Sequence, residues 1–239
     1  MTPRPPRGAK NRALLTVERL RDLYQAETEL GHENPFQLLI ATILSAQTTD
    51  RSVNLVTPEL FRRYPTAEDL AAADPAEVEK LIKPTGFFRL KTRRIIAASR
   101  ALVEVFGGEV PRTMEEMVKI PGIGRKTANV ILGAGFDSPG FAVDTHVTRL
   151  TNRLGFVATK DPVKIEHQVC SMVPQEEWTA LSLRLILHGR RICDARRPRC
   201  EECVLNDLCP SSLVRPRRRL RKGRPIGEAP GSDIKLASA

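Results

Sequence analysis

Residues 120–132 read IPGIGRKTANVIL and join two short stretches whose apolar residues have helical spacing. Pro121 ends the first stretch, and Gly122 and Gly124 permit a tight turn before the second. A helix that begins behind glycine leaves backbone N–H groups open to a phosphate, without any demand on base sequence. The stretch therefore predicts a helical hairpin with an anion site at its turn, although short Pro-Gly connections are more often plain turns.

The rest of the chain also reads as helices. Asn, Asp or Thr followed by Pro, or by Glu three residues later, marks helix starts at positions 34, 74, 113 and 161. Alternation of the kind found in strands is hard to find. Apolar spacing predicts helices over residues 16–29, 35–46, 50–63, 67–72, 75–82, 89–105, 114–119, 124–134, 145–154, 162–172 and 176–190. The predicted fold class is all-α.

The positive charge of the chain lies at its two ends. The net charge is +10, yet residues 13–212 hold 26 basic and 26 acidic side chains. The basic ends can solubilise the protein or tether it weakly to DNA. Residues 213–239 lose apolar periodicity and gain proline, glycine and arginine, which predicts a disordered tail.

The chain has no segment typical of membrane insertion or secretion. Its richest apolar stretch, Leu38 to Leu44, is much shorter than the roughly 18 residues of a membrane span. The apolar patch near the N-terminus, Ala13 to Val17, is too short for a secretory signal. We therefore expect an intracellular protein.

Four of the five cysteines lie close together near the C-terminus. They are spaced C-x6-C-x2-C-x5-C, and in an intracellular chain such spacing indicates a metal site and not disulfides. Zinc ribbons generally have two CxxC pairs and this run has one, which favours an iron–sulfur cluster without excluding zinc. The four are Cys193, Cys200, Cys203 and Cys209. The fifth, Cys170, lies in a predicted amphipathic helix and reads as a small buried hydrophobe.

The hairpin, the sequence VDTH at residues 143–146 and the cysteine run together resemble the helix-hairpin-helix DNA glycosylase superfamily. The lysine inside the hairpin, Lys126, is similar to that of the endonuclease III branch in particular, and the resemblance extends over residues 14–212. It implies two helical lobes with the active site between them. A six-helix lobe would comprise residues 34–137, and an iron–sulfur lobe would combine residues 13–33 with 138–212.

The resemblance implies a bifunctional DNA glycosylase/AP lyase of base excision repair that acts on oxidised pyrimidines in double-stranded DNA. Lys126 would attack C1′ of the damaged nucleotide, expel the base and form a Schiff base, and β-elimination would then nick the strand 3′ to the lesion. The helix dipole and the neighbouring Arg125 favour a neutral, nucleophilic amine, although a phosphate-binding or surface lysine is the plainer interpretation of the residue alone. The same resemblance implies a [4Fe–4S] cluster held by the four cysteines.

The resemblance also gives a role to Asp144. From the residues alone this aspartate reads as the N-cap of the next helix. In the resembled family, the aspartate at this place activates the lysine and stabilises positive charge on the sugar. Both roles are compatible, because a capping side chain can still face a cleft. His146 reads as structural.

Two further residues are implied to act on the DNA stack. Gln47, in LSAQTTD, would fill the gap left by the extruded base, and Phe87, in TGFFRLKTRR, would wedge the opposite strand. Better-known members carry an aliphatic wedge, so the phenyl ring is a departure that can alter lesion preference. A loop aromatic packed on Phe88 and a polar residue that ends a buried helix are the competing interpretations.

DNA phosphates are expected at the hairpin and around the cysteine loop. The predicted contacts are Gly122, Gly124, Arg125, Arg191, Arg196, Arg197 and Arg199. We expect a monomer in the cytoplasm, associated with the nucleoid if the source is bacterial. Three alternatives stay open: an adenine-type monofunctional glycosylase, a non-catalytic iron–sulfur DNA-binding protein and a zinc-binding adaptor.

Overall fold

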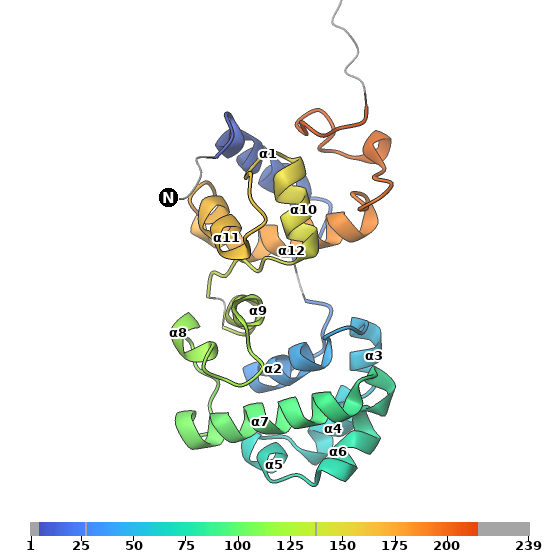
Figure 1. The fold of residues 1–239 in the computed structure, drawn as a ribbon, viewed down its shortest axis with the longest axis vertical. Coiled ribbons are helices and arrows are strands. Elements are labelled where there is room, and N and C mark those ends of the chain that lie inside the picture. Colours follow the sequence, from blue (N-terminus) through green and yellow to red (C-terminus); the bar gives the residue numbers. More distant parts are fainter. Residues whose placement is uncertain (1–4, 27, 137, 215–239) are drawn as a thin grey trace, which may run out of the picture.

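The structure of the chain, a computed structural model, describes residues 5–26, 28–136 and 138–214. Within these ranges every regular element is helical, which confirms the all-α prediction. Figure 1 shows two groups of helices, one above the other along the long axis of the molecule. The predicted tail comprises residues 213–239, and residues 215–239 of it lie outside the described residues.

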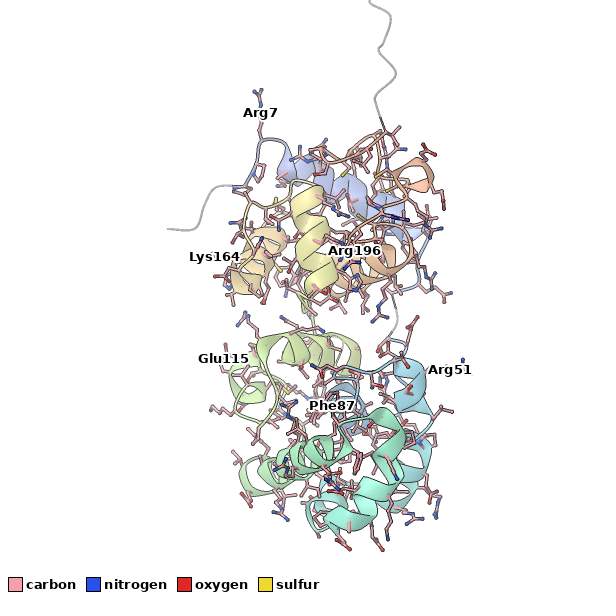
Figure 2. All side chains as sticks on the ribbon, turned by 45° about the vertical axis from the view of Figure 1, so that its right-hand side comes forward. Arg7, Arg51, Phe87, Glu115, Lys164 and Arg196 are labelled. Carbon is pink, nitrogen blue, oxygen red and sulfur yellow. The ribbon has the colours of Figure 1, made fainter. Side chains whose placement is uncertain are left out.

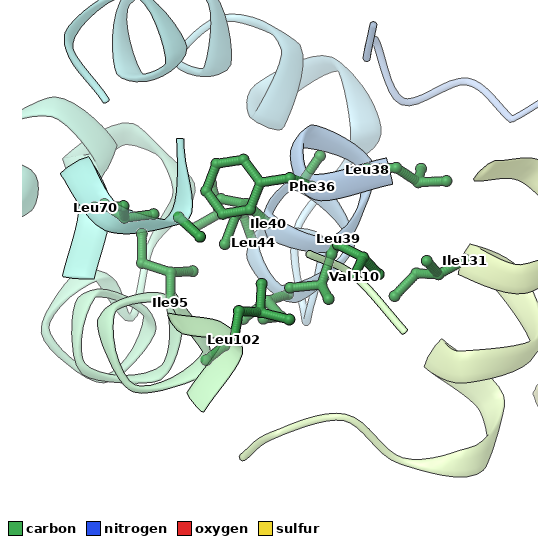
Figure 3. Close-up of a cluster of buried hydrophobic side chains, with 14 of the residues drawn as sticks. Phe36, Leu38, Leu39, Ile40, Leu44, Leu70, Ile95, Leu102, Val110 and Ile131 are labelled. Atoms are coloured by element: carbon green, nitrogen blue, oxygen red, sulfur yellow. The ribbon is translucent and has the colours of Figure 1, made fainter. Parts of the chain in front are cut away.

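The lower group of helices is built around an almost fully buried helix, α2. Because Phe36, Leu38, Leu39, Ile40 and Leu44 are all buried, α2 is apolar nearly all round and lies inside its lobe (Figure 3). Helices α7 and α9 pack directly against it. This lobe contains α2 (Pro35–Leu44), α3 (Asp50–Asn54), α4 (Thr57–Arg63), α5 (Ala67–Ala71), α6 (Pro75–Ile82), η1 (Lys83–Thr85), α7 (Phe88–Phe106), α8 (Met114–Met117) and α9 (Arg125–Gly135).

The upper group brings the N-terminal helix together with the C-terminal part of the chain. Its core includes Leu20, Phe141, Leu150, Phe156 and Leu185, and α12 packs against both α1 and α10. The elements are α1 (Ala9–Arg21), α10 (Thr145–Arg153), α11 (Pro162–Cys170), η2 (Gln175–Glu177), α12 (Trp178–Arg191) and η3 (Cys200–Glu202). Two separate hydrophobic clusters support a division into two lobes, and the bounds at residues 34 and 137 stay a prediction.

Two predicted helices differ clearly from those observed. The segment predicted as one helix over residues 50–63 is two helices, α3 and α4. Pro58 lies at the start of α4 and has no N–H to donate to the preceding turn, so the first helix ends before it. The helix predicted over 16–29 begins instead after Gly8, which adopts the left-handed conformation, and ends at Arg21. The residues after Tyr24 then connect the two lobes.

Most of the helices begin at a polar side chain that satisfies the first backbone N–H groups, each such cap contributing about 1 kcal/mol. The capping residues are Asn34, Thr49, Thr66, Asp74, Thr113, Asp144 and Asp161. Helix α9 is among the helices without such a cap, and its N-cap is Gly124. Among the described helices, none is long and apolar enough to cross a membrane.

Candidate active site and cysteine-rich loop

A pocket of about 300 Å³ lies between the two lobes and is lined by both. Lys126 of α9 and Asp144, which caps α10, are both on its wall. The sequence places these two residues 18 positions apart, and the fold brings them to one cavity. The full lining is Thr28, Glu29, Leu30, Thr42, Ser45, Ala46, Gln47, Asp50, Lys126, Thr127, Val130, Asp144, Leu183, Ile186, Leu187 and Arg190.

The turn before Lys126 has the geometry of an open anion site. Gly122 has a φ of 86°, which favours glycine. Gly124 has a φ of −94°, and a Cβ added to it would meet no atom within 4 Å. Neither the backbone nor the packing therefore requires glycine at position 124. Its small size instead leaves the first N–H groups of α9 accessible to a group that approaches from outside.

Lys126 is the second residue of α9, and its side chain is exposed. Thr127 and Val130, on the same face of the helix, also line the pocket. Lys126 thus lines a partly apolar wall of the cavity and is also open to solvent. This is the position that a nucleophile toward a bound sugar needs.

Asp144 is half-buried and caps α10, because its Oδ1 accepts a hydrogen bond from Val147 N at 2.8 Å. The chain that leads to it is bound on two sides. Asn129 of α9 donates from Nδ2 to Phe141 O at 3.3 Å, and Ser182 of α12 donates from Oγ to Ala142 O at 2.7 Å. These contacts hold the aspartate at a fixed place relative to α9, and sequence reasoning missed both donors.

The segment before Asp144 approaches α9 closely, and this explains the glycine at position 140. A Cβ on Gly140 would lie 2.7 Å from the carbonyl oxygen of Asn129, closer than any side chain tolerates. Asn129 lies one helical turn beyond Lys126. The distance between Lys126 and Asp144 is therefore set by rigid contacts and not by two independent loops.

Arg125, a predicted DNA contact, is engaged with another side chain. Its Nε and Nη2 donate to the two carboxylate oxygens of Glu166 at 2.8 and 2.7 Å, and this bond raises the pKa of Arg125. Glu166 lies on α11, so the pair joins the two lobes beside Lys126. A phosphate at Arg125 would have to share the guanidinium with Glu166 or replace it.

A second set of ion pairs lies at the pocket itself. Arg190 of α12 approaches Glu29 Oε2 at 3.5 Å and Asp50 Oδ2 at 3.6 Å. Glu29 belongs to the connection between the lobes, and Asp50 begins α3. Arg190 was not among the predicted contacts. Its partners are distant in sequence, and no local pattern reveals them.

Gln47 and Phe87 share an unusual backbone conformation. They are the two non-glycine residues with positive φ in the described part of the chain, at 56° and 46°. This conformation costs on the order of 1–3 kcal/mol for such residues and tends to mark functional sites. Gln47 is exposed at the pocket, and Phe87 is 65% exposed on the same lobe (Figure 2). An exposed phenyl ring differs from the packed loop aromatic that was the competing interpretation.

The four C-terminal cysteines line one small, largely apolar pocket in the upper lobe and form no disulfide. Arg153 Nη1 lies 3.3 Å from Cys193 Sγ, and His188 Nε2 lies 3.3 Å from Cys203 Sγ. The Arg153 guanidinium is a donor that suits thiolate sulfur. Among the described residues, no three Cys, His, Asp or Glu side chains meet around one point as the ligands of a single metal ion do. Four thiols around a shared space are a donor set suited to an iron–sulfur cluster.

The arginines of the cysteine loop fall into two groups. Arg196 and Arg197 are exposed, and their backbone N–H groups donate to Asp194 Oδ1, which lowers the pKa of that carboxyl. Their guanidinium groups form no ion pair within the described residues. Arg199 pairs with Glu202 at 3.1 Å, and the Arg191 guanidinium lies over the ring of Tyr24 at 5.6 Å. Arg196 and Arg197 are therefore freer to bind phosphates than Arg199 and Arg191.

Two residues set aside in the sequence analysis have structural surroundings. His146 packs against Gly189, where an added Cβ would lie 2.9 Å away, and its Nδ1 lies 3.1 Å from Arg149 Nη2. Cys170 is half-buried beside the Arg125–Glu166 pair, and burial raises the pKa of its thiol to about 12. Neither lines the pocket between the lobes.

Comparison with known proteins matches the two motif regions separately. Residues 40–175 match the HhH-GPD superfamily base excision DNA repair protein, and residues 193–209 match the iron-sulfur binding domain of endonuclease III. Endonuclease III of Synechocystis is 50% identical over 205 residues, 85% of this chain and 94% of that protein. Endonuclease III of Bacillus subtilis is 44% identical over 208 residues, 86% and 95% of the two chains.

Solved structures agree with these relatives. A trapped endonuclease III–DNA covalent intermediate, an estranged-adenine complex, superposes with a TM-score of 0.78 and 41% identity, covering 84% of this chain and 96% of that one. A non-covalent endonuclease III–DNA complex gives the same TM-score and identity, with 84% and 95% coverage. The resemblance stated from the sequence is confirmed: this chain belongs to the endonuclease III family of the HhH-GPD superfamily of base excision DNA repair proteins.

Proposed function

We propose that this protein is a bifunctional DNA glycosylase and AP lyase that removes oxidised pyrimidines from duplex DNA in base excision repair. The observation that carries this function is a lysine and an aspartate on the wall of one pocket between the lobes, in a member of the endonuclease III family. An endonuclease III that superposes on this chain forms a covalent intermediate with DNA. The position of Lys126 supports the same chemistry in this protein.

In the first step, Lys126 Nζ attacks C1′ of the damaged nucleotide as a neutral amine. A bond forms between Nζ and C1′, the bond from C1′ to the base breaks, and the base leaves with the electron pair and takes up a proton. The Asp144 carboxylate stabilises the positive charge that develops on the sugar as the base leaves, and it then accepts the proton that Nζ loses.

In the second step, the sugar ring opens and the lysine adduct becomes a protonated Schiff base. This cation acidifies the neighbouring C2′, so that loss of a C2′ proton expels the 3′ phosphate and breaks the C3′–O bond. The strand is thus nicked 3′ to the lesion. Water then releases Lys126 from the sugar fragment.

The same assignment gives the remaining site residues their roles. The N–H groups behind Gly122 and Gly124 bind one phosphate, while Arg196 and Arg197 of the cysteine loop bind others. Gln47 fills the gap left by the extruded nucleotide, and Phe87 separates the opposite strand. Arg125, Arg191 and Arg199 also bind phosphates, once phosphate replaces the side chains that they contact in the structure. Binding needs no second copy of the chain, so we propose a monomer in the cytoplasm, associated with the nucleoid if the source is bacterial.

A [4Fe–4S] cluster belongs to this family, and we propose that Cys193, Cys200, Cys203 and Cys209, which line one pocket, would hold it. When bound, the cluster supplies a covalent cross-link that fixes the loop carrying Arg196 and Arg197. Arg153 donates toward Cys193 Sγ, and His188 Nε2 lies within hydrogen-bond distance of Cys203 Sγ. We assign the group a structural and DNA-docking role.

The test of the function is a duplex that contains one thymine glycol. We expect release of the free modified base together with a nick 3′ to its position, and neither product from the same duplex with thymine. Base release without a nick would favour the monofunctional, adenine-type alternative. Tight binding with neither product would favour the non-catalytic alternative.

The loop arginines predict a specific salt dependence. Replacing Arg196 or Arg197 by alanine should weaken binding to any duplex and lower the slope of log K against log salt by about one per arginine. Fluorescence anisotropy at several salt concentrations measures this slope. Arg62→Ala, an exposed arginine paired with Glu59 on α4, is the control and should leave the slope unchanged. An unchanged slope in both loop variants would show that this loop does not touch DNA.

Removing one cluster ligand should release the iron. We expect Cys203→Ala to contain much less iron than the wild type, to lose the brown colour and to unfold at a lower temperature, because the loop around it loses its cross-link. Cys170→Ala is the matched control, since Cys170 is outside the four-cysteine pocket, and it should keep its iron. Equal iron in both variants would remove Cys203 from the ligand set, and zinc in place of iron in the wild type would contradict the cluster.

A further inference from the structure

The segment that carries the proposed wedge is held in a conformation that the chain does not adopt readily. Gly86 and Phe87 follow each other with φ values of 66° and 46°. Phe87 precedes α7 without a capping hydrogen bond from its side chain, and its ring is 65% exposed. Since the ring gains little from packing, the strain at Phe87 must be offset by contacts on either side of it.

Leu90 N donates to Phe87 O at 3.0 Å, and Thr85 Oγ1 donates to Gly86 O at 3.4 Å. The residue that reaches both sides of the segment is Lys91 of α7. Its side-chain Nζ donates to Thr85 O at 2.7 Å, on one side of Gly86 and Phe87. Its backbone N–H donates to Phe87 O at 3.0 Å, on the other side. Lys91 thus joins both ends of the strained segment, and its side chain is the part that a substitution can remove.

Lys91 is also the wrong residue for simple packing. It is only 2% exposed, and burial lowers the pKa of its ammonium group. Burying a charged group costs free energy unless the group is paired or hydrogen-bonded. A methionine would fill the same space without that cost. The presence of an amine here is explained by the Thr85 carbonyl, which would otherwise be a buried acceptor at the end of η1.

The anchor point is itself well fixed. Thr85 is buried, and its Oγ1 donates to Ile82 O at 2.8 Å at the end of α6. The short helix η1 packs against α3, which begins just after the loop that contains Gln47. The segments that carry the proposed wedge, Phe87, and the proposed gap-filling residue, Gln47, are therefore attached to two elements of one lobe, η1 and α3, that pack against each other.

We propose that Lys91 is a positioning residue for strand separation: its buried amine, bonded to Thr85 O, holds Gly86 and Phe87 in the positive-φ conformation that presents the phenyl ring to the DNA. Lys91 does not touch the reacting atoms. The proposal rests on the proposed function and adds a residue that acts only where an opposite strand has to be opened.

The test compares two substrates that share the same lesion strand. In the first, an abasic site lies opposite 2-aminopurine in an intact duplex. In the second, the opposite strand has a gap at that position, so that nothing has to be wedged apart. The readouts are the single-turnover rate of borohydride-trapped adduct and, on the first substrate, the rise in 2-aminopurine fluorescence when the base unstacks.

We expect Lys91→Met to form adduct about ten-fold or more slowly than the wild type on the intact duplex, with little fluorescence rise, because the ring is misplaced. On the gapped duplex its rate should stay within about two-fold of the wild type. Phe87→Ala should give the same pattern, and Lys91→Met with Phe87→Ala should be no slower than either change alone. Lys80→Met, an exposed lysine of α6, is the control and should match the wild type on both substrates.

A second pair of variants guards against misfolding. Lys91→Gln replaces Lys91→Met if the latter does not fold, and Lys91→Arg, which keeps a charged donor, should retain more of the duplex rate than either. Equal slowing on the intact and gapped duplexes would overturn the proposal. A double variant whose rate loss on the intact duplex equals the product of the two single losses would also overturn it. Failure of the wild type to form adduct on either substrate would instead overturn the proposed function, which separates the two failures.

Discussion

Lys126→Ala should lose base release, strand cleavage and the borohydride-trapped adduct together, by roughly 10⁴-fold or more, because no other group supplies the nucleophile. Binding to the same duplex should change by no more than about ten-fold, because the proposed phosphate contacts at the hairpin turn and the cysteine loop are kept. Lys126 is exposed in the first turn of α9, and alanine is a good helix former, so the free energy of unfolding should change by less than about 0.5 kcal/mol. Denaturing gels of the trapped adduct measure the main effect.

The control for Lys126→Ala is Lys164→Ala, which removes an exposed lysine from the first turn of another helix, α11. We expect it to trap DNA as the wild type does. A Lys126→Ala protein that binds DNA and still forms the adduct would show that another amine is the nucleophile. The pocket would then have a different chemical role from the one assigned to it.

Asp144→Asn should separate the catalytic role of this residue from its role as a cap. Asparagine caps a helix as well as aspartate, so the hydrogen bond to Val147 N and the stability of α10 should be kept. Without the carboxylate, the proton from Lys126 has no acceptor and the sugar cation has no counter-charge. Base release should therefore fall about 10²- to 10³-fold. On a preformed abasic site the loss should be smaller, because no base has to leave.

The matched control is Asp161→Asn. Asp161 caps α11 in the same way, accepting hydrogen bonds from Val163 N at 2.9 Å and Lys164 N at 3.2 Å, and it lies outside the pocket. Single-turnover kinetics and thermal melting on both variants decide the matter. If Asp144→Asn were as active as Asp161→Asn, Asp144 would be a cap and nothing more.

Local sequence signals predicted much of this molecule because they act over a few residues. The proline and glycines of residues 121–124 define the hairpin, and Asp144 is identifiable as a cap from its position before an apolar helix. The cysteine spacing identifies one loop without any knowledge of the fold. These patterns, with the family resemblance they carry, were sufficient for the all-α class and for the endonuclease III family.

Contacts across the lobes were beyond such reasoning. Arg125 looked like a DNA contact in sequence, and only the fold shows Glu166 opposite it. Arg190 bridges Glu29 and Asp50, which come from two distant parts of the chain. Asn129 and Ser182, which fix the approach to Asp144, carry no motif at all. Ion pairs and buried hydrogen bonds between residues distant in sequence depend on how the helices pack, and local periodicity does not predict that packing.

Backbone strain was equally invisible in the sequence. Gln47 and Phe87 were singled out by resemblance, yet nothing local predicts that both adopt positive φ. A buried lysine at position 91 also reads as an ordinary polar residue of a long helix until its depth is known. Only the three-dimensional structure links these features.

The central claim is that Lys126 is the residue that becomes covalently bound to the sugar, and peptide mapping tests it most directly. The wild-type protein is reduced with borohydride on a duplex containing one thymine glycol, digested, and analysed by mass spectrometry. We predict that the sugar remnant is found on Lys126 and on no other amine. A remnant on a different lysine or on the N-terminal amine, with Lys126 unmodified, would contradict the account.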